Sequence, residues 1–285
     1  MDLKTFIQQY SRDLESVSES PALDLQVLVA HRLKKPRSWV LAHLEEPLPE
    51  GSFSVLYGDV SLLLQGVPLP YVLGEWEFYG NRFIVTPDVL IPRPETELLV
   101  EKALEWINSY PETKLVVDIG TGSGCIAISL ALANPNIQVI ATDISIKALK
   151  IAQQNIHFHH VEERVFLLQA DLHPALYQKV DLICANLPYI PKQDLLSLKV
   201  AEKEPLIALD GGENGLILYR RLLTQLAERA ESPHFLLCEI DPHQAIPLDT
   251  FIGQLFPFSH RQVYCDLYGF ERLMTVEFNK DERRR

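Results

Sequence analysis

The most informative pattern in the chain is VVDIGTGSGCIAISLAL, at residues 116–132. Three glycines, Gly120, Gly122 and Gly124, separate a short apolar run from a longer one. The first run is typical of a strand buried on both faces, and the second of a helix. Glycine permits positive φ angles and lets a backbone approach a ligand closely. The pattern predicts a strand, a ligand-binding loop and a helix in an open α/β sheet, although a purely structural turn also stays open.

Apolar and amphipathic segments alternate along the chain from Lys114 onward. The runs IQVIATD, RVFLLQAD, VDLICAN and HFLLCEI are typical of buried strands, and the longer segments SIKALKIAQQNIHFHH and GLILYRRLLTQLAERA predict helices. This alternation favours a mostly parallel sheet with helices on both faces. Two more strand-like runs flank Tyr268-Gly269, and we expect them to form an antiparallel pair at the sheet edge.

The N-terminal part of the chain has a different character. Four segments show apolar residues at helical spacing with short connections between them, which predicts a small helical bundle. The segment EWEFYGNRFIV, residues 75–85, alternates around Tyr79-Gly80-Asn81 and predicts a β-hairpin. We therefore expect a helical domain at residues 1–73, a β-hairpin linker at 74–93 and an α/β domain at 94–280.

The overall composition disfavours several classes of protein. The chain has 38 acidic and 26 basic residues and a formal net charge of −12, whereas proteins that bind duplex DNA usually present a basic face, so no DNA partner is expected. We expect a cytoplasmic protein with no membrane partner, because no apolar run could span a bilayer and the first residues lack the apolar core of a signal peptide. The four cysteines form no C-x-x-C pair, so we expect four buried, reduced thiols and no metal site.

Acidic residues accompany the ends of the predicted strands, where ligands bind in this kind of sheet. Asp118 precedes the glycine loop, and Asp143 ends the strand IQVIATD, where its carboxylate can accept both hydroxyls of a ribose. Asp171 and Leu172 follow the third strand, in position to border an adenine. A dinucleotide fingerprint, G-x-G-x-x-G, would need glycine where Cys125 stands. The pattern resembles motif I of the S-adenosylmethionine (SAM)-dependent methyltransferases more than a nicotinamide site, because an acidic loop suits a cationic ligand better than a pyrophosphate.

The segment VDLICANLPYIPK, residues 180–192, brings further polar groups to the same edge of the sheet. A strand-ending turn would explain Asn186 and Pro188 by itself. However, the segment resembles the (N/D)-P-P-Y motif of methyltransferases that modify planar nitrogens, whose delocalised lone pair is a poor nucleophile. The side-chain carbonyl of Asn186 and the backbone carbonyl of Leu187 can each accept one N–H and so direct that lone pair at a methyl donor. We expect Pro188 to fix this backbone and Tyr189 to flank the planar group.

Leu187 is a departure from that motif, whose first proline it replaces. The position is expected to act through its backbone carbonyl, which leucine also supplies. Leucine lacks the fixed φ angle of proline, so we expect a less preorganised acceptor. A protein that binds the cofactor but transfers no methyl group stays an open alternative.

Two further stretches, at residues 68–104 and 204–223, carry a more specific resemblance. PLPYVLGEWEFYGNRFIVTPDVLIPRPETELLVEKAL and EPLIALDGGENGLILYRRLL resemble the release factor glutamine methyltransferases (the PrmC/HemK family), and the resemblance extends over about residues 66–278. Members of this family transfer a methyl group from SAM to the side-chain amide of the glutamine in the GGQ motif of bacterial peptide chain release factors. The resemblance implies the same activity, with a release factor as the protein partner. It also implies a Rossmann-like, seven-stranded SAM-methyltransferase domain joined through the hairpin to a helical domain that recognises the substrate.

The resemblance also implies roles for single residues. The residues implied to hold the glutamine are Asn186, Leu187, Pro188 and Tyr189. The residues implied to hold SAM are Asp118, Gly120, Thr121, Gly122, Ser123, Gly124, Asp143, Asp171, Leu172 and Asn186. In IPRPETE, Arg93, Glu95 and Glu97 would shape the mouth of the pocket, unless they only begin a helix. We expect the protein to be a monomer.

An adenine-amine methyltransferase acting on DNA or RNA is the main alternative, since it would use the same N-x-P-Y site. A DNA enzyme of this kind flips its target base out of the helix, and we expect it to carry a basic groove and a target-recognition domain. The acidic composition and the small helical domain disfavour DNA. An RNA substrate is separable by testing whether ribosomal or transfer RNA accepts a methyl group.

Overall fold

The computed structural model describes residues 1–174, 176, 178–195, 197–198, 203–228 and 233–278. The chain forms two compact units, Met1–Glu75 and Trp76–Arg285. The boundary between them falls inside the first strand of the predicted hairpin. Within the described ranges, no helix is both long enough and apolar enough to cross a membrane.

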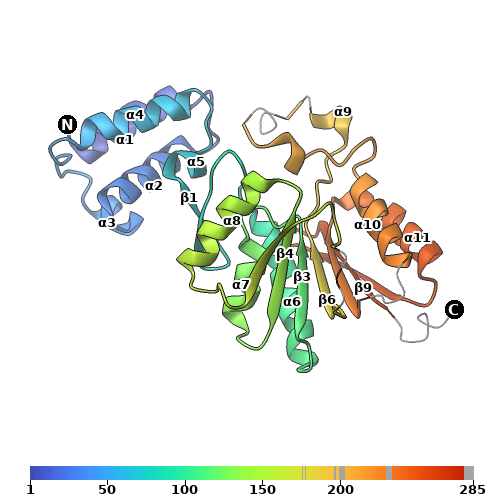
Figure 1. Cartoon of the computed structure of the whole chain (residues 1–285). Helices are drawn as coiled ribbons and strands as arrows, with labels where there is room; N and C mark the ends of the chain where they lie inside the picture. The colour runs from blue at the N-terminus through green and yellow to red at the C-terminus, as the bar shows by residue number, and fades with distance from the viewer. Residues whose placement is uncertain (175, 177, 196, 199–202, 229–232, 279–285) are drawn as a thin grey trace. The chain divides into compact units, whose positions relative to one another are not determined.

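The N-terminal unit is a bundle of helices, drawn in blue shades in Figure 1. Its helices are α1 (Leu3–Leu14), α2 (Pro21–Leu33), α3 (Arg37–Ala42), α4 (Ser52–Leu64) and α5 (Leu69–Leu73). The first four correspond to the four predicted segments, whereas the short α5 was not expected; its proline lies in the first turn, where a helix tolerates one. Phe6, Leu25 and Leu56 of α1, α2 and α4 are completely buried in this unit.

The predicted hairpin forms from β1 (Glu75–Phe78) and β2 (Asn81–Ile84). Its two turn residues, Tyr79 and Gly80, have positive φ angles of 50° and 69°, as a two-residue type I′ turn requires. Tyrosine is strained in this conformation, so the turn needs support from its surroundings. The Tyr79 N–H donates to the carboxylate of Glu97 at 2.8 Å, which supplies part of that support.

Seven strands form the sheet of the second unit. In chain order they are β3 (Leu115–Ile119), β4 (Gln138–Asp143), β5 (Val165–Gln169), β6 (Leu182–Ala185), β7 (Phe235–Glu239), β8 (His260–Cys265) and β9 (Glu271–Glu277). Their spatial order is β5-β4-β3-β6-β7-β9-β8, and all neighbours from β5 to β7 are parallel. β9 runs antiparallel to both β7 and β8. The prediction of a seven-stranded, mostly parallel sheet with an antiparallel pair at its edge is confirmed.

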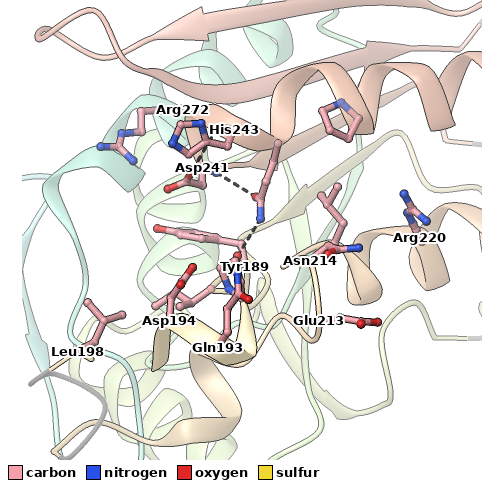
Figure 2. Close-up of a pocket in the computed structure, with 15 residues that line it drawn as sticks. Tyr189, Gln193, Asp194, Leu198, Glu213, Asn214, Arg220, Asp241, His243 and Arg272 are labelled. Carbon is pink, nitrogen blue, oxygen red and sulfur yellow. Dashed lines mark hydrogen bonds between the residues drawn. The ribbon is translucent and has the colours of Figure 1, made fainter. Parts of the chain in front are cut away.

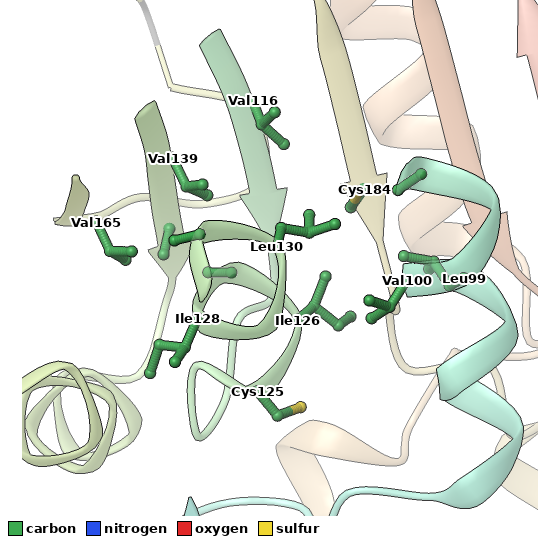
Figure 3. Close-up of a cluster of buried hydrophobic side chains, with 14 of the residues drawn as sticks. Leu99, Val100, Val116, Cys125, Ile126, Ile128, Leu130, Val139, Val165 and Cys184 are labelled. Carbon is green, nitrogen blue, oxygen red and sulfur yellow. The ribbon is translucent and has the colours of Figure 1, made fainter. Parts of the chain in front are cut away.

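Helices cover both faces of this sheet (Figure 1). One hydrophobic cluster involves α6 (Glu97–Ser109), α7 (Cys125–Ala133) and α8 (Ile146–Phe158), and the other involves α10 (Ile217–Ala227) and α11 (Ala245–Leu255). Figure 3 shows part of the first cluster, where side chains of β3, β4 and β6 meet those of α6 and α7. Successive residues of β3 alternate between the clusters, with Val116 in the first and Val117 in the second. Because β3 is buried on both faces, its charged residue, Asp118, needs a functional explanation.

The carboxyl ends of the parallel strands lie together at one edge of the sheet. β3 pairs with β4 on one side and with β6 on the other, so the strand order reverses at β3. Ligands of open α/β sheets bind outside the strand ends at such a switch point. The glycine-rich loop follows β3 and the N-L-P-Y segment follows β6, which brings both sequence motifs to this point.

The expectation of four buried cysteines was wrong for one of them. Three are buried, but Cys265 is exposed. Cys265 is the last residue of β8, at the edge of the sheet, where a register irregularity interrupts the pairing with β9. A residue at the end of an edge strand has no second neighbouring strand to cover it.

Candidate active site

The glycine-rich loop between β3 and α7 is attached to the end of β4. Gly120 and Thr121 both donate backbone N–H bonds to the carbonyl of Thr142, at 2.9 and 2.8 Å. The N–H of Gly122 donates to Asp143 Oδ2 at 2.9 Å. All three glycines of the loop have positive φ angles, which explains why glycine is needed there. A Cβ built on Gly122 would meet no atom within 4 Å, so this side of the loop is open to a ligand.

Asp118 lies completely buried beneath this loop. The Thr121 hydroxyl donates to Asp118 Oδ2 at 2.6 Å, while Oδ1 has no partner in good hydrogen-bond geometry among the described residues. Burial raises the pKa of Asp118 to about 7, although hydrogen bonds from Thr121 and the Ala127 N–H lower it. A buried carboxylate is costly in its charged form unless a cation or further donors stabilise it. The site therefore suits a positively charged ligand.

Asp143 ends β4 next to the loop, as the sequence predicts. Its Oδ1 accepts the Ser145 N–H at 2.8 Å, and its Oδ2 accepts the N–H of Gly122. Burial raises the pKa of Asp143, and these backbone bonds oppose the rise. Each carboxylate oxygen has two lone pairs, so both retain capacity for another donor, such as the hydroxyls of a ribose.

Asp171 and Leu172 follow β5, but the structure turns both side chains to other partners. The Asp171 carboxylate pairs with Arg221 of α10 at 2.5 Å. Leu172 has a φ angle of 67°, and its side chain belongs to the hydrophobic cluster under α10 and α11. Their assignment beside an adenine stays a prediction.

The Asn186 side chain has a defined orientation at the end of β6. Its amide nitrogen donates to Thr96 Oγ1 and to Glu239 Oε2, both at 3.0 Å. Because both N–H groups are used, the free polar atom is the carbonyl Oδ1, which accepts no hydrogen bond from the described residues. Burial raises the pKa of Glu239 to about 7, while hydrogen bonds from Thr96 and Tyr189 lower it and the charge of Glu95 raises it. The Asn186 amide is thus held with its acceptor available.

Leu187 makes a hydrogen bond that proline at this position could not make. Its side chain is buried, and its N–H donates to the hydroxyl of Tyr219 on α10 at 3.2 Å. The same hydroxyl contacts the carbonyls of Ala185, at 3.1 Å, and of Glu239. Tyr219 thereby ties the ends of β6 and β7 to the N-L-P-Y segment. We expected the absence of proline at position 187 to make this backbone less rigid. The contact with Tyr219 restores part of that rigidity.

Close packing joins the two motifs. A Cβ on Gly120 would lie 3.2 Å from Leu187 Cδ2 and 3.4 Å from the backbone carbonyl oxygen of Asn186, so the glycine-rich loop and the N-L-P-Y segment touch. On the other side, a Cβ on Gly215 would overlap the Tyr189 carbonyl. Gly215 also has a positive φ angle of 69°. A Cβ on Gly211 would lie 2.7 Å from Tyr189 Cα, so Gly211 and Gly215 of the segment DGGENGL, residues 210–216, are needed to let the backbone approach Tyr189.

A pocket of about 610 Å³ opens beside Tyr189 (Figure 2). Residues after β6 line one side, including Asp194, and Asp241, His243 and Arg272 lie toward the other (Figure 2). Burial raises the pKa of Tyr189 well above its usual value, so its hydroxyl stays protonated at neutral pH. The volume of this pocket is in the range that proteins use to bind small ligands and side chains.

Several residues that hold the N-L-P-Y segment were given no role from the sequence. They are Thr96, Tyr219, Glu239 and Gln244. Gln244 donates to the Tyr189 carbonyl at 2.8 Å. Only Glu239 carries a signal of its own: it is a carboxylate at the carboxyl end of a buried strand, the same pattern that identifies Asp143.

The three residues expected at the pocket mouth have structural partners. Arg93 pairs with the buried carboxylate of Glu204 at 2.6 Å. Glu97 accepts the backbone N–H of Tyr79 in the hairpin turn. Glu95 is close enough for its charge to raise the pKa of Glu239. Arg93 and Glu97 therefore brace neighbouring segments, and a role at the pocket mouth stays a prediction.

Comparison with known proteins identifies both units. The family model for the PrmC N-terminal domain matches residues 5–74, and that for the Methyltransferase small domain matches residues 94–204. The Release factor glutamine methyltransferase of Bacillus anthracis is 35% identical over 280 residues, which cover 96% of this chain and 95% of that protein. The protein of the same name from Enterococcus faecalis is 39% identical over 249 residues, covering 84% and 86%.

Solved structures show the same fold. The hMettl16 catalytic domain in complex with the MAT2A 3′UTR hairpin 6 has a TM-score of 0.59 at 15% identity, covering 78% of this chain and 83% of that chain. At this identity, the likeness is informative for the fold alone. The relatives that match nearly the whole chain are informative for the family. The chain belongs to the release factor glutamine methyltransferase family.

Proposed function

We propose that this chain transfers a methyl group from SAM to the side-chain amide nitrogen of the glutamine in the GGQ motif of a bacterial peptide chain release factor. Membership of the family supports this substrate class. The structural observation that carries the proposal is the Asn186 amide, whose N–H groups are both engaged by Thr96 and Glu239. This leaves the Asn186 carbonyl oxygen as an acceptor for the substrate.

Two adjacent acceptors suit a primary amide. Asn186 Oδ1 and the backbone carbonyl of Leu187 accept no hydrogen bond from the described residues, and each can take one N–H of the glutamine. Both bonds strengthen as positive charge develops on the nitrogen, so they stabilise the transition state more than the ground state. The ring of Tyr189 flanks the planar group. Once the new N–C bond has formed, the nitrogen releases one proton to solvent.

The glycine-rich side of the site fits SAM. The negative charge of Asp118, buried beneath the loop, favours the ammonium of the cofactor, and Asp143 suits its ribose hydroxyls. The open space above Gly122 leaves room for the ligand against the loop backbone. When bound, SAM supplies an electrophilic methyl group on a cationic sulfur. The contact between Gly120 and Leu187 keeps the cofactor loop next to the segment that would hold the amide.

The test is methyl transfer from labelled SAM to a purified, unmethylated release factor. A parallel substrate carries Gln→Ala in its GGQ motif. We expect label on the first protein and none on the second. Equal labelling of both proteins, or labelling of ribosomal or transfer RNA instead, would contradict the proposed substrate.

We also propose that the helical domain at residues 1–73 provides a second surface for the release factor, with residues 74–93 as linker and 94–280 as catalytic domain. The match of residues 5–74 to the PrmC N-terminal domain supports this division. Removal of residues 1–73 should weaken release factor binding and leave SAM binding unchanged. If the shortened chain and the full chain have equal KM values for the release factor, this role of the helical domain is contradicted. The monomeric state and cytoplasmic location expected from the sequence stay predictions.

A further inference from the structure

An exposed apolar turn lies at the same edge of the sheet as the active site. The turn between β8 and β9 carries three exposed residues, Leu267, Tyr268 and Phe270, and the least exposed of them, Phe270, is 54% exposed. In the sheet, Glu239 of β7 pairs with Leu273 of β9. Because β9 begins where β7 ends, the β8–β9 turn lies on the carboxyl side of the sheet. We call the three side chains Leu267, Tyr268 and Phe270 the hairpin tip.

The backbone beneath the hairpin tip is fixed. Asp266 Oδ1 accepts the N–H groups of Tyr268 and Phe270, both at 2.9 Å, and its Oδ2 accepts Arg272 Nε at 3.0 Å. Gly269 supplies the positive φ angle, 84°, that the turn requires. Large apolar groups on an ordered turn contribute little to the core, and grouped exposure of this kind is typical of an interaction site. An ordered turn also loses little backbone entropy when it binds a partner.

Arg272 connects the hairpin tip to the pocket beside Tyr189. Its guanidinium lies 5.7 Å from the centre of the Phe270 ring and is also bonded to Asp266. Arg272 lines the pocket as well, where Figure 2 shows it near His243. The pocket wall and the exposed turn are therefore parts of one continuous surface.

We propose that the hairpin tip is a docking element for the release factor and binds an apolar patch next to the segment that carries the GGQ glutamine. The inference rests on the proposed function. Because Tyr189 and Arg272 line the same pocket, the backbone that flanks a glutamine bound beside Tyr189 would pass Arg272 if it leaves through this pocket. The small GGQ residues offer little apolar area themselves, so a neighbouring apolar contact would supply affinity without disturbing the geometry of the amide.

The test is a variant that carries Leu267→Ser, Tyr268→Ser and Phe270→Ser. It retains Asp266, Gly269 and all backbone donors of the turn, so the turn should still form. We expect the KM for the release factor to rise about tenfold, which corresponds to about 1.4 kcal/mol of binding energy. We expect kcat at saturating release factor and the Kd for SAM to stay within about twofold of the wild type.

Phe258→Ser is the matched control. Phe258 is 62% exposed and precedes β8 at its opposite end, since His260 pairs with Glu277, the last residue of β9. Its substitution should leave the KM unchanged. An unchanged KM for the release factor in the triple variant would overturn the inference and leave the proposed function intact. The same conclusion would follow if the triple substitution altered only the self-association of the protein in sedimentation experiments. If the wild type itself labels no release factor, both the proposed function and this inference fail.

Discussion

The glycine-rich loop and the N-L-P-Y segment touch each other, yet they are held in different ways. The loop is held mainly by the next strand, through the carbonyl of Thr142 and the carboxylate of Asp143. The N-L-P-Y segment is held by four side chains from three parts of the chain, namely Thr96, Tyr219, and the neighbouring Glu239 and Gln244. The half of the site proposed to bind the cofactor therefore depends on a short pattern, and the half proposed to bind the substrate depends on the packing of the whole domain.

Replacement of Asn186 should have the largest effect, mainly on methyl transfer and much less on SAM binding. Asn186→Ala removes an acceptor aimed at the substrate amide, so kcat should fall at least about 100-fold, as it does when a single oxyanion-type hydrogen bond is lost. The Kd for SAM should rise only slightly. Steady-state kinetics with a release factor and calorimetric SAM titration would measure both values.

Asp143→Ala is the reciprocal variant. It should raise the Kd for SAM and leave kcat at saturating SAM much closer to the wild type. Unchanged turnover in Asn186→Ala, or an unchanged SAM affinity in Asp143→Ala, would show that the two halves are not separable in this way.

Removal of the Tyr219 hydroxyl should have the next largest effect. Tyr219→Phe leaves the Leu187 N–H and two buried carbonyls without this partner. We expect a loss of about 1–3 kcal/mol in the free energy of unfolding and about tenfold in kcat. Urea denaturation and saturating kinetics would test this.

Tyr264→Phe is a suitable control, because the Tyr264 hydroxyl makes no hydrogen bond among the described residues and its ring faces Lys102. Tyr264→Phe should change neither the free energy of unfolding nor kcat. A Tyr219→Phe variant that is less stable but fully active would mean that Tyr219 supports the fold without positioning Leu187.

SAM binding should depend on pH through Asp118. The pKa of Asp118 is raised to about 7, so the carboxylate loses its charge as the pH falls below 7. Attraction for a ligand ammonium is lost with it, and the Kd for SAM should rise by up to about tenfold per pH unit between pH 7 and 5.5. Calorimetric titrations across this range would measure the slope.

Asp118→Asn should weaken binding at pH 7.5 and flatten this dependence. Glu239→Gln is the control, because Glu239 also has a raised pKa of about 7 but bonds to Asn186 on the substrate side. Glu239→Gln should retain the wild-type dependence of the Kd for SAM on pH. A flat profile in the wild type would remove Asp118 from the cofactor site.

Introduction of proline at position 187 should have the smallest effect on activity. Leu187→Pro removes the N–H bond to Tyr219 and the buried leucine side chain, but it fixes the φ angle. We expect kcat within about threefold of the wild type and about 1–3 kcal/mol less stability. A gain of tenfold or more in kcat would show that Leu187 limits the wild-type enzyme, and a comparable loss would show that the Tyr219 contact is required.

Features that depend on a local requirement could be read from the sequence more completely than contacts between distant residues. The glycines of the loop and Asp143 were assigned to one place because each obeys a local requirement, a positive φ angle or a strand end. Asp171 lies just after the end of β5, and its carboxylate pairs with Arg221, fifty residues away. Cys265 looked like the other apolar-run cysteines but lies at the end of an edge strand. A local pattern contains no information on which distant side chain competes for a polar group.

The order of apolar runs was sufficient for the α/β class, the helical N-terminal unit and the presence of both motifs at one sheet edge, because burial imposes its own periodicity on the sequence. The orientation of the Asn186 amide was decided only by tertiary structure. Its two acceptors are 90 and 53 residues distant along the chain. The role of Leu187 was also decided by tertiary structure. The sequence predicts a loss of rigidity from leucine in place of proline, whereas in the folded protein the Leu187 N–H donates to the Tyr219 hydroxyl. Hydrogen bonds between distant segments depend on ångström-scale geometry, which exists only once the sheet and its helices have packed.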